Sequence, residues 1–566
     1  MDSPTIELTG AQAILRVLRA AGIHDAFGLA SGKLSPIYRA MSEDPEWCYT
    51  GVRHEAAAAF MATAVGWATG RMAMCLGETG PGSQNLLSAL GGASANGLAA
   101  IALTSSNPSF LLDPHRGAFS SSRNETAFGL VCKSSSTLRD GDRIPEVVRH
   151  ALRTALSGRP GPVHLDVPAE VLAGRFNFDR AELDAEPGRY RALAPSLPVP
   201  SVLAEAADLL ASARRPLVIA GGGVVRSGAT AAVRALVERL GAPAITTQMG
   251  IGVIADGDPH LLGQGGLLAG PAAKRAMAEA DVVLAIGCRF SSFLWMEGPP
   301  AWNARPDQKL IQIDIDPTVF GRNAPVSLGL LGDANATANA LLEVVSGPDL
   351  DAEWTARLNT EAQAYRSSLL DLAEDVTDPL HPAALARAVG SMICATDLVT
   401  YDGGHTSFWS NDFTPVSEPA TRFHEPGAAH LGFGLASSIA MARVMPDRRH
   451  FCLTGDGALG FTIQELDTAR RYGANVITVV HNNAAWGVIA AGQRKGGFSL
   501  GTDLEGTDYA AIAKGFGCHG EVVHDVDQVA PAIERALASG LPAVIDARVR
   551  FAPHPMMPVF GKSTSR

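Results

Sequence analysis

The stretch "FCLTGDGALGFTIQELDTARRYGANVITVVHNN", residues 451–483, decides the fold. Its apolar runs "FCLT" and "NVITVV" indicate buried strands, and "FTIQELDTARRYG" between them has the apolar face of a helix. A strand–helix–strand unit of this kind predicts two neighbouring parallel strands. Since parallel strands end at one edge of their sheet, we expect Asp456 in the turn "GDGALG" to lie close to Asn483.

The residues around this edge predict a magnesium and phosphate site. Gly455 and Gly457 let a backbone approach a phosphate group, and the N-terminus of the following helix attracts anions. The Asp456 carboxylate, the Asn483 amide oxygen and a nearby main-chain carbonyl are the oxygen ligands that Mg²⁺ prefers. Asn482 is expected to shape the turn that presents Asn483.

The whole chain alternates β-rich apolar runs with helical patterns, which predicts parallel α/β layers. With 566 residues it is too long for one core, and polar stretches at 181–201 and 346–378 interrupt the pattern. We expect three domains and a tail, at 1–180, 200–345, 376–550 and 551–566. The expected fold class is α/β, with three doubly wound parallel-sheet domains. The central one is Rossmann-like and expected to be structural, because "GGGVVRSG" (221–228) departs from GxGxxG.

The bulk composition excludes several classes of protein. A net charge of −11 argues against a nucleic-acid or membrane-surface partner. The N-terminus does not resemble a secretory signal, and no apolar run is long enough to span a bilayer. Seven scattered cysteines without a CxxC pair indicate reduced thiols. We therefore expect a cytoplasmic protein.

Asp456 and Asn483 also carry a family resemblance, because "GDG…NN" at this spacing resembles the motif of thiamine diphosphate (ThDP)-dependent enzymes. The resemblance covers nearly the whole chain. "GVRHEAAAAFMATAVGWATGR" (51–71) is similar to the Glu-bearing helix of the family's pyrimidine-binding domain, and "GETGPGSQNLLSAL" (77–90) to its GPG–Asn loop. "GAAHLGFGLA" (427–436) is similar to the segment that supports the cofactor rings. The resemblance implies pyrimidine-binding, central Rossmann-like and diphosphate-binding domains in this order.

The resemblance also implies the cofactors and their ligands. ThDP would bind with Mg²⁺, and the metal ligands would be Asp456, Asn483 and the carbonyl of Ala485. Further cofactor contacts are implied at Gly82, Asn85, His405, Thr406, Gly455, Gly457, Ala458, Trp486 and Gly487.

Three residues are implied to act on the cofactor rings. Glu55 would lie against the aminopyrimidine ring, so that ThDP becomes a carbon nucleophile and then an electron sink. Leu431 would hold the cofactor bent, and the Ala429 carbonyl would accept a hydrogen bond from its amino group. In the family this Glu reaches a cofactor held by the neighbouring subunit, which implies a homodimer or a dimer of dimers.

Fewer residues bear on the identity of the substrate than on that of the cofactor. Acetolactate synthases typically carry "AFQE" and "MVxQW", where this chain has "AFSSS" (118–122) and "WGVIAAGQ" (486–493). Oxalyl-CoA decarboxylases carry a Tyr-Glu pair where Phe119 and Ser120 make a roomier, less polar wall. This wall favours a 2-hydroxyacyl-CoA lyase that cleaves substrates such as 2-hydroxyisobutyryl-CoA to formyl-CoA and a ketone or aldehyde. An acetolactate synthase-like transferase, an oxalyl-CoA-type decarboxylase and a catalytically silent scaffold are the alternatives.

The tail "FGKSTSR" (560–566) is basic and rich in hydroxyl groups, which suits a lid over CoA phosphates; a frayed terminus is an equal alternative. The expected substrate contacts are Ser31, Gly32, Phe119, Ser120, Arg494, Lys562, Ser563 and Arg566.

The helix after the asparagines raises a further hypothesis. Ile489 occupies a position where some decarboxylases place a catalytic Glu, and Gln493 lies one turn later on the same face. We expect Gln493 to be a catalytic residue that faces the substrate, with a solvated side chain as the alternative. An amide forms hydrogen bonds but accepts no proton at neutral pH, so the site is expected to work better with a carboxylate at 493.

Overall fold

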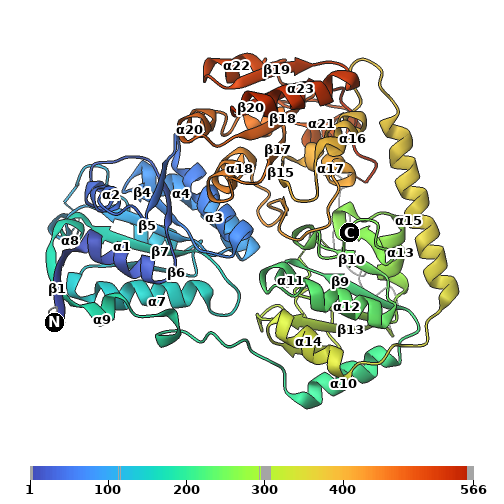
Figure 1. Ribbon diagram of the computed structural model, residues 1–566, viewed down its shortest axis with the longest axis horizontal. Coiled ribbons are helices and arrows are strands. Elements are labelled where there is room, and N and C mark those ends of the chain that lie inside the picture. The colour runs from blue at the N-terminus through green and yellow to red at the C-terminus, as the bar shows by residue number, and fades with distance from the viewer. Residues whose placement is uncertain (1–3, 113, 115, 292–293, 295–306, 557–566) are drawn as a thin grey trace.

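A computed structural model describes residues 4–556 of the chain, except 113, 115, 292–293 and 295–306. It contains three six-stranded parallel sheets, each lying between helices (Figure 1). A two-stranded antiparallel sheet of β1 (Thr5–Thr9) and β8 (Arg175–Asp179) lies beside the first of them. The expected fold class, three parallel α/β domains, is confirmed.

The first sheet belongs to the N-terminal domain. Its strands, in order across the sheet, are β3 (Cys48–Gly51), β2 (Asp25–Gly28), β4 (Met74–Glu78), β5 (Ile101–Ser106), β7 (Val163–Pro168) and β6 (Ser134–Thr137). The helices of this domain are α1 (Gly10–Ala20), α2 (Ser35–Ser42), α3 (Glu55–Thr69), α4 (Pro81–Asn96), α5 (Ser109–Leu112), α6 (Asn124–Phe128), α7 (Ile144–Leu156), α8 (Ala169–Ala173) and α9 (Arg180–Leu183).

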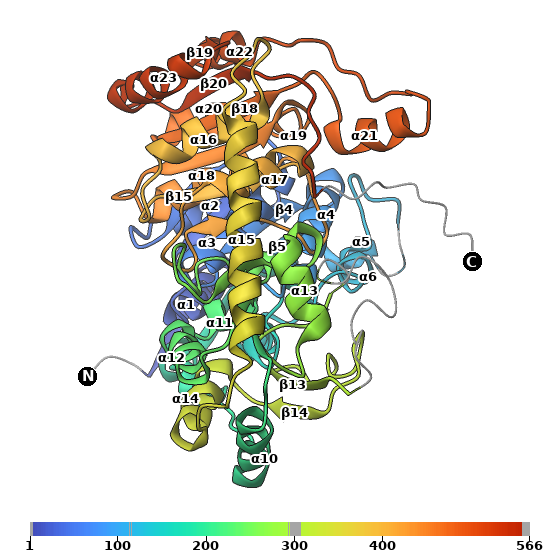
Figure 2. The ribbon, with the colours of Figure 1, turned by 90° about the vertical axis from the view of Figure 1, so that its right-hand side faces the viewer.

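The second sheet forms the centre of the chain. Its strand order is β11 (Leu261–Gln264), β10 (Ala244–Thr246), β9 (Pro216–Ala220), β12 (Val282–Ile286), β13 (Lys309–Asp314) and β14 (Leu328–Leu331). Its helices are α10 (Pro200–Ala211), α11 (Gly222–Arg226), α12 (Thr230–Leu240), α13 (Pro271–Glu279) and α14 (Ala334–Val344). The 22-residue helix α15 (Ala352–Ala373) then runs along the edge of the molecule towards the C-terminal domain (Figure 2).

The third sheet contains the stretch that decides the fold. Its strand order is β16 (Arg422–Phe423), β15 (Leu398–Asp402), β17 (His450–Gly455), β18 (Val476–Asn482), β20 (Ala543–Arg548) and β19 (His519–Val523). Its helices are α16 (Pro382–Met392), α17 (Gly404–Phe413), α18 (Phe433–Val444), α19 (Asp456–Leu459), α20 (Glu465–Tyr472), α21 (Gly487–Lys495), α22 (Tyr509–Gly515) and α23 (Val526–Ser539).

Strands β17 and β18 pair in parallel, as expected, with Gly455 opposite His481. The helix between them is shorter than the sequence pattern predicts, because α20 begins only at Glu465. Buried apolar side chains explain the register, since Phe451, Leu453, Ile477 and Val479 pack in one core on the same face of the sheet.

The N- and C-terminal domains pack directly on each other within one chain. Helix α3 lies against α18. Trp67 of α3 also stacks on Phe423 of β16, with the ring centroids 5.4 Å apart. Two main-chain N–H groups also cross this boundary: Gly51 donates to the Tyr472 hydroxyl (2.8 Å) and Arg53 to Glu465 (3.1 Å). The two domains that carry the expected cofactor residues are therefore fixed relative to one another (Figure 1).

Two expectations from composition are answered in part. Within the described residues no helix is both long and apolar enough to cross a membrane. All seven cysteines are free, and those that are buried are Cys75, Cys288, Cys452 and Cys518.

Candidate functional site

Asp456 lies at the carboxyl end of β17 as the first residue of α19, and only 3% of it is exposed. Its Oδ1 accepts a hydrogen bond from the Gly457 N–H (2.9 Å). Its Oδ2 is buried and has no hydrogen-bond partner among the described residues. Burial raises the pKa of this carboxyl to about 6. A buried carboxylate oxygen without a donor is a suitable ligand for a cation.

The two asparagines have different surroundings. Asn482 is the last residue of β18, and its Nδ2 donates to the Thr507 carbonyl (3.0 Å) and to Asp546 Oδ1 (2.9 Å). The expectation that Asn482 shapes the turn is therefore wrong, because its side chain ties β18 to β20 and the loop before α22. Asn483 accepts from the Ala485 N–H (3.1 Å), and between them Ala484 has a φ of 52°. The Asn483 side chain thus organises its own turn, next to Asp456.

Side chains of the C-terminal domain close around this edge. A Cβ atom at Gly457 would come within 2.6 Å of the Trp486 ring, and one at Gly487 within 2.6 Å of His405 Nδ1. The backbone therefore approaches these rings as only glycine permits. His405 Nε2 is buried without a partner in the described part of the chain, and burial lowers the pKa of this imidazole to about 4. His405 is thus neutral at pH 7, and its Nε2 can bond a ligand. Thr406 lies beside it and is buried.

Glu55 begins α3 in the N-terminal domain and is 9% exposed. Asn85 of α4 donates to its Oε2 (2.9 Å), and a Cβ atom at Gly82 would lie 3.1 Å from its Oε1. The carboxyl is thus held by the GPG loop and the helix that follows it. Glu55, Gly82 and Asn85, three of the sequence-predicted residues, are brought together.

The segment around Ala429 and Leu431 is anchored on both sides. Ala429 has a φ of 55°, a left-handed conformation that costs an alanine roughly 1–3 kcal/mol and is typical of functional sites. His430, between the two residues, contacts Ser88 Oγ through Nε2 (2.9 Å) and Glu425 through Nδ1 (3.1 Å). Ser88 lies one helical turn after Asn85. The ring-supporting segment is therefore tied to the helix that holds Glu55.

Asp402 is a buried carboxylate at the same sheet edge, and the sequence interpretation missed it. It ends β15, and its buried carboxylate accepts from the N–H groups of Gly432 (3.2 Å) and Gly434 (2.9 Å). Burial raises the pKa of this carboxyl to about 7. The apolar strand "LVTYD" before "GGHT" is the sequence signal that places an acid at this edge.

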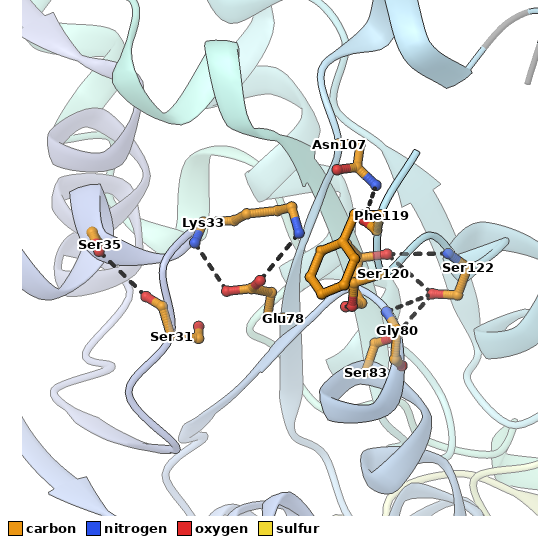
Figure 3. A network of polar contacts seen from close by, with 11 residues as sticks. Ser31, Lys33, Ser35, Glu78, Gly80, Ser83, Asn107, Phe119, Ser120 and Ser122 are labelled. Atoms are coloured by element: carbon orange, nitrogen blue, oxygen red, sulfur yellow. Dashed lines mark hydrogen bonds and ion pairs between the residues drawn. The ribbon is translucent and has the colours of Figure 1, made fainter. Parts of the chain in front are cut away.

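The expected substrate wall lies at the carboxyl edge of the N-terminal sheet (Figure 3). Phe119 is 91% exposed, and its carbonyl accepts from Asn107 (3.2 Å). Ser120 has a φ of 55°, and its Oγ donates to the Thr79 carbonyl (2.8 Å). The Ser120 hydroxyl therefore holds the wall in place, while the Phe119 ring is open.

Gln493 does not extend freely from α21. Its Oε1 accepts from the Leu500 N–H (2.7 Å), and its Nε2 donates to the Leu500 carbonyl (3.3 Å). Both halves of the amide therefore bind the loop after α21, since the helix and this loop fold back on each other (Figure 2). Ile489, one turn earlier, is half exposed.

Of the expected CoA contacts, Arg494 lies in the described part of the chain and the residues of the tail lie outside it. Arg494 forms an ion pair with Asp503 (2.8 Å), and its guanidinium stacks on Phe551 with 4.1 Å to the ring centroid. Phe551 also lies 5.6 Å from the His405 ring, so the chain after β20 passes over the diphosphate-side helix α17. The predicted substrate contacts Lys562, Ser563 and Arg566 lie outside the described residues.

A cavity of about 520 Å³ lies between the central domain, which the sequence predicts to be structural only, and the N-terminal domain. Gly222, Gly223 and Gly287 form part of its lining, together with Arg226 and Arg289. Burial lowers the pKa of Arg226 to about 9 and of Arg289 to about 10, and the charge of nearby Arg159 adds to both effects. The volume and these cations suit an anionic ligand.

The residues of the C-terminal edge fit a diphosphate cofactor with Mg²⁺. The buried Asp456 Oδ2 and the Asn483 side-chain oxygen offer the kind of oxygen ligands that Mg²⁺ prefers. No cluster of three or more His, Cys, Asp or Glu side chains in the described ranges is arranged to hold a metal ion. The predicted set needs none, because it combines one carboxylate with amide and carbonyl oxygens.

Three family descriptions match the chain, one for each sheet. They are the N-terminal TPP binding domain (residues 8–128), the central domain (203–341) and the C-terminal TPP binding domain (402–547) of thiamine pyrophosphate enzymes.

Curated relatives match along the entire length. A probable acetolactate synthase large subunit of Methanocaldococcus jannaschii is 30% identical over 99% of this chain and 95% of its own. The acetolactate synthase large subunit of Parasynechococcus marenigrum is also 30% identical, over 99% and 90%. The isozyme 1 large subunit of Escherichia coli is 27% identical, over 96% and 94%. These relatives carry the name of the alternative function rather than of the expected lyase.

The different surroundings of the two asparagines give a paired test. Asn482→Ala removes two buried hydrogen bonds and should lower the free energy of unfolding by about 1–3 kcal/mol in urea titrations without cofactor. Asn483→Ala removes one partly buried hydrogen bond, so it should lower that stability less than Asn482→Ala does, but it should abolish the added stability that Mg²⁺ and ThDP confer on the unmodified protein. Equal losses of stability in the two variants, or full stabilisation of Asn483→Ala by the cofactors, would contradict the assignment.

Proposed function

The chain belongs to the thiamine pyrophosphate enzyme family, and on this premise we propose that it makes or breaks a carbon–carbon bond next to a carbonyl group. ThDP, when bound, supplies a carbon nucleophile for that carbonyl and accepts the electron pair of the broken bond. Asp456, Asn483 and the Ala485 carbonyl would hold the Mg²⁺ ion that accompanies the diphosphate. The burial of Asp456 supports this proposal, because its unpaired oxygen needs a cation or a proton.

The residues of this chain divide the remaining work. Glu55 holds a proton at the pyrimidine ring, and its bond from Asn85 keeps its carboxyl in place. Neutral His405 would donate a hydrogen bond to the diphosphate, and the Ala429 carbonyl would accept one from the cofactor amino group. Leu431 would supply the apolar contact that holds the cofactor bent.

We propose that the substrate is a 2-hydroxyacyl-CoA with a small alkyl group, such as 2-hydroxyisobutyryl-CoA. The open wall at Phe119 carries this proposal, because it offers apolar surface where other branches have polar side chains. Loss of the substrate hydroxyl proton breaks the carbon–carbon bond and releases a ketone or aldehyde, and protonation of the remaining carbon gives formyl-CoA. The reaction is reversible, and the segment after Phe551 is the proposed lid over CoA.

An acetolactate synthase-like transferase is the second candidate. The names of the relatives, all acetolactate synthase large subunits, support this candidate more directly than they support the lyase. The departures at 118–122 and 486–493 are the argument against it. At 30% identity the residues that face the substrate are free to differ while the cofactor chemistry is kept.

We propose that two copies of the chain complete each site. Glu55 lies on a different domain from the sheet edge that carries Asp456 and Asn483, here called the metal edge. The surface beside the metal edge exposes large apolar side chains. They are Phe461, Ile489, Phe498 and Leu500, the last of them 80% exposed. An exposed apolar group of this kind beside a site suits contact with another subunit. The reduced thiols support a cytoplasmic location.

The reaction is tested with a panel of CoA esters. With ThDP and Mg²⁺, the purified protein should release formyl-CoA and acetone from 2-hydroxyisobutyryl-CoA, detected by mass spectrometry. Glu55→Gln should reduce this rate by at least about 10²-fold, because the proton transfer at the ring is lost. Acetolactate formed from pyruvate, with no formyl-CoA from any ester, would establish the second candidate instead.

Replacement of Gln493 tests the expected need for a base. Gln493→Glu should raise kcat for the CoA ester by about 10²-fold, because a carboxylate can accept the substrate hydroxyl proton. Its oxygen can still accept the Leu500 N–H, whereas the bond from Nε2 to the Leu500 carbonyl is lost. Gln493→Met, similar in size, should not accelerate the reaction. A Glu variant no faster than the unmodified protein would refute the hypothesis.

A further inference from the structure

A partly buried ion pair lies in the expected substrate wall, at Lys33 and Glu78. Lys33 Nζ is 3.1 Å from Glu78 Oε1, and the Lys33 N–H donates to Glu78 Oε2 (2.9 Å). The side chains are only 20% and 22% exposed. Lys33 directly follows the predicted substrate residues Ser31 and Gly32 in the loop after β2.

Two contacts connect the pair with the rest of the site. Glu78 is the last residue of β4, four positions before Gly82, whose Cβ position lies 3.1 Å from the Glu55 carboxyl. On its other side, Lys33 Nζ lies 6.0 Å from the centroid of the exposed Phe119 ring. Figure 3 shows the Lys33 side chain extended between Glu78 and Phe119. The pair therefore lies between the loop that holds the predicted catalytic acid and the ring that faces the substrate.

The electrostatics indicate that Glu78 is ionised. Burial favours its protonated form, but hydrogen bonds and the charge of Lys33 outweigh burial and hold the pKa of this carboxyl below its ordinary value. Tyr38 lies close enough to both Glu55 and Glu78 for their charges to add to burial in raising the pKa of its phenol to about 12. Glu78 and Glu55 therefore lie close enough for both to influence the same phenol.

Stability alone does not account for the pair. Partly buried ion pairs lose much of their attraction to desolvation, and apolar side chains of similar size often serve as well. At a substrate wall, however, an ion pair keeps the net charge at zero while leaving polar groups near the acyl chain. A neutral wall suits an acyl group without charge, whereas an isolated lysine would attract a carboxylate.

We propose that the Lys33–Glu78 pair determines specificity by neutralising the wall that faces the acyl group, so that uncharged acyl chains are accepted over carboxylate-bearing ones. This inference rests on the proposed function for the identity of the substrate. Neither residue takes part in the bond-breaking step; the pair sets the charge that the substrate meets.

Removing one charge at a time should shift specificity in opposite directions. Glu78→Gln leaves an unpaired ammonium and should raise kcat/KM for an acyl-CoA with a terminal carboxylate, relative to its neutral counterpart, by about tenfold. Lys33→Met leaves an unpaired carboxylate and should lower the same ratio by about tenfold. Both variants lose the ion pair, so a purely structural role would change the two ratios in the same way or not at all. Lys33→Arg should restore the original ratio.

The matched control is the exposed Arg39–Glu43 pair on the neighbouring helix α2. Glu43→Gln removes the same charge from the same domain and should leave the ratio unchanged. ThDP affinity, measured by calorimetry, should be equal in all variants. Ratios that move in the same direction in Glu78→Gln and Lys33→Met, or that stay within twofold of the unmodified protein, would overturn the inference.

A parallel measurement separates this inference from the proposed function. Turnover of pyruvate, whose carboxylate adjoins the carbonyl, is compared with that of acetaldehyde in the same variants. If no CoA ester reacts, the proposed lyase function fails, and opposite shifts in the pyruvate ratio still support the charge-setting pair. If the esters react but neither ratio shifts, the inference fails and the function stands. Turnover of neither class overturns both.

Discussion

The parallel pairing of β17 with β18 is the constraint on which the site depends. It brings the Gly455–Asp456 turn next to the end of β18, because Gly455 lies opposite His481. The sheet leaves Asp456 Oδ2 buried without a donor, a cost of about 1–3 kcal/mol unless a cation or proton is bound. Asn482 and Asp546 secure the neighbouring strands, so this unsatisfied oxygen persists in a rigid frame. The edge proposed to hold the metal ion thus keeps an oxygen that has no donor among the described residues, within a frame that the sheet supports.

Local patterns in the sequence carry much of this architecture. The apolar runs at 451–454 and 476–480 predict both strands, and their spacing predicts that Asp456 and Asn483 share an edge, as the pairing confirms. The glycines beside Asp456 already indicate a close approach of backbone to a ligand. These properties depend on neighbours in sequence and on the twofold side-chain alternation of a strand, so they can be derived without a structure.

The features that could not be predicted depend on contacts that no helix or strand period reveals. Asn482 bonds Asp546, 64 positions away, which no turn propensity reveals. Gln493 lies on the expected face of its helix, but the loop at Leu500 occupies its amide. The Lys33–Glu78 pair joins residues 45 positions apart, one in the loop after β2 and the other at the end of β4. In these two long-range cases, the sheets set the spacing that brings the polar side chains together.

The loop after α21 is attached to its helix by two contacts that respond differently to dissolved salt. Gln493 binds Leu500, and Arg494 binds Asp503. The Arg494–Asp503 pair is exposed, with 42% and 65% of its side chains accessible, so dissolved salt weakens it. The Gln493 amide bonds carry no net charge and are insensitive to salt. Ionic strength therefore acts on one of the two attachments and leaves the other unchanged, so high salt loosens this loop without freeing it from the helix.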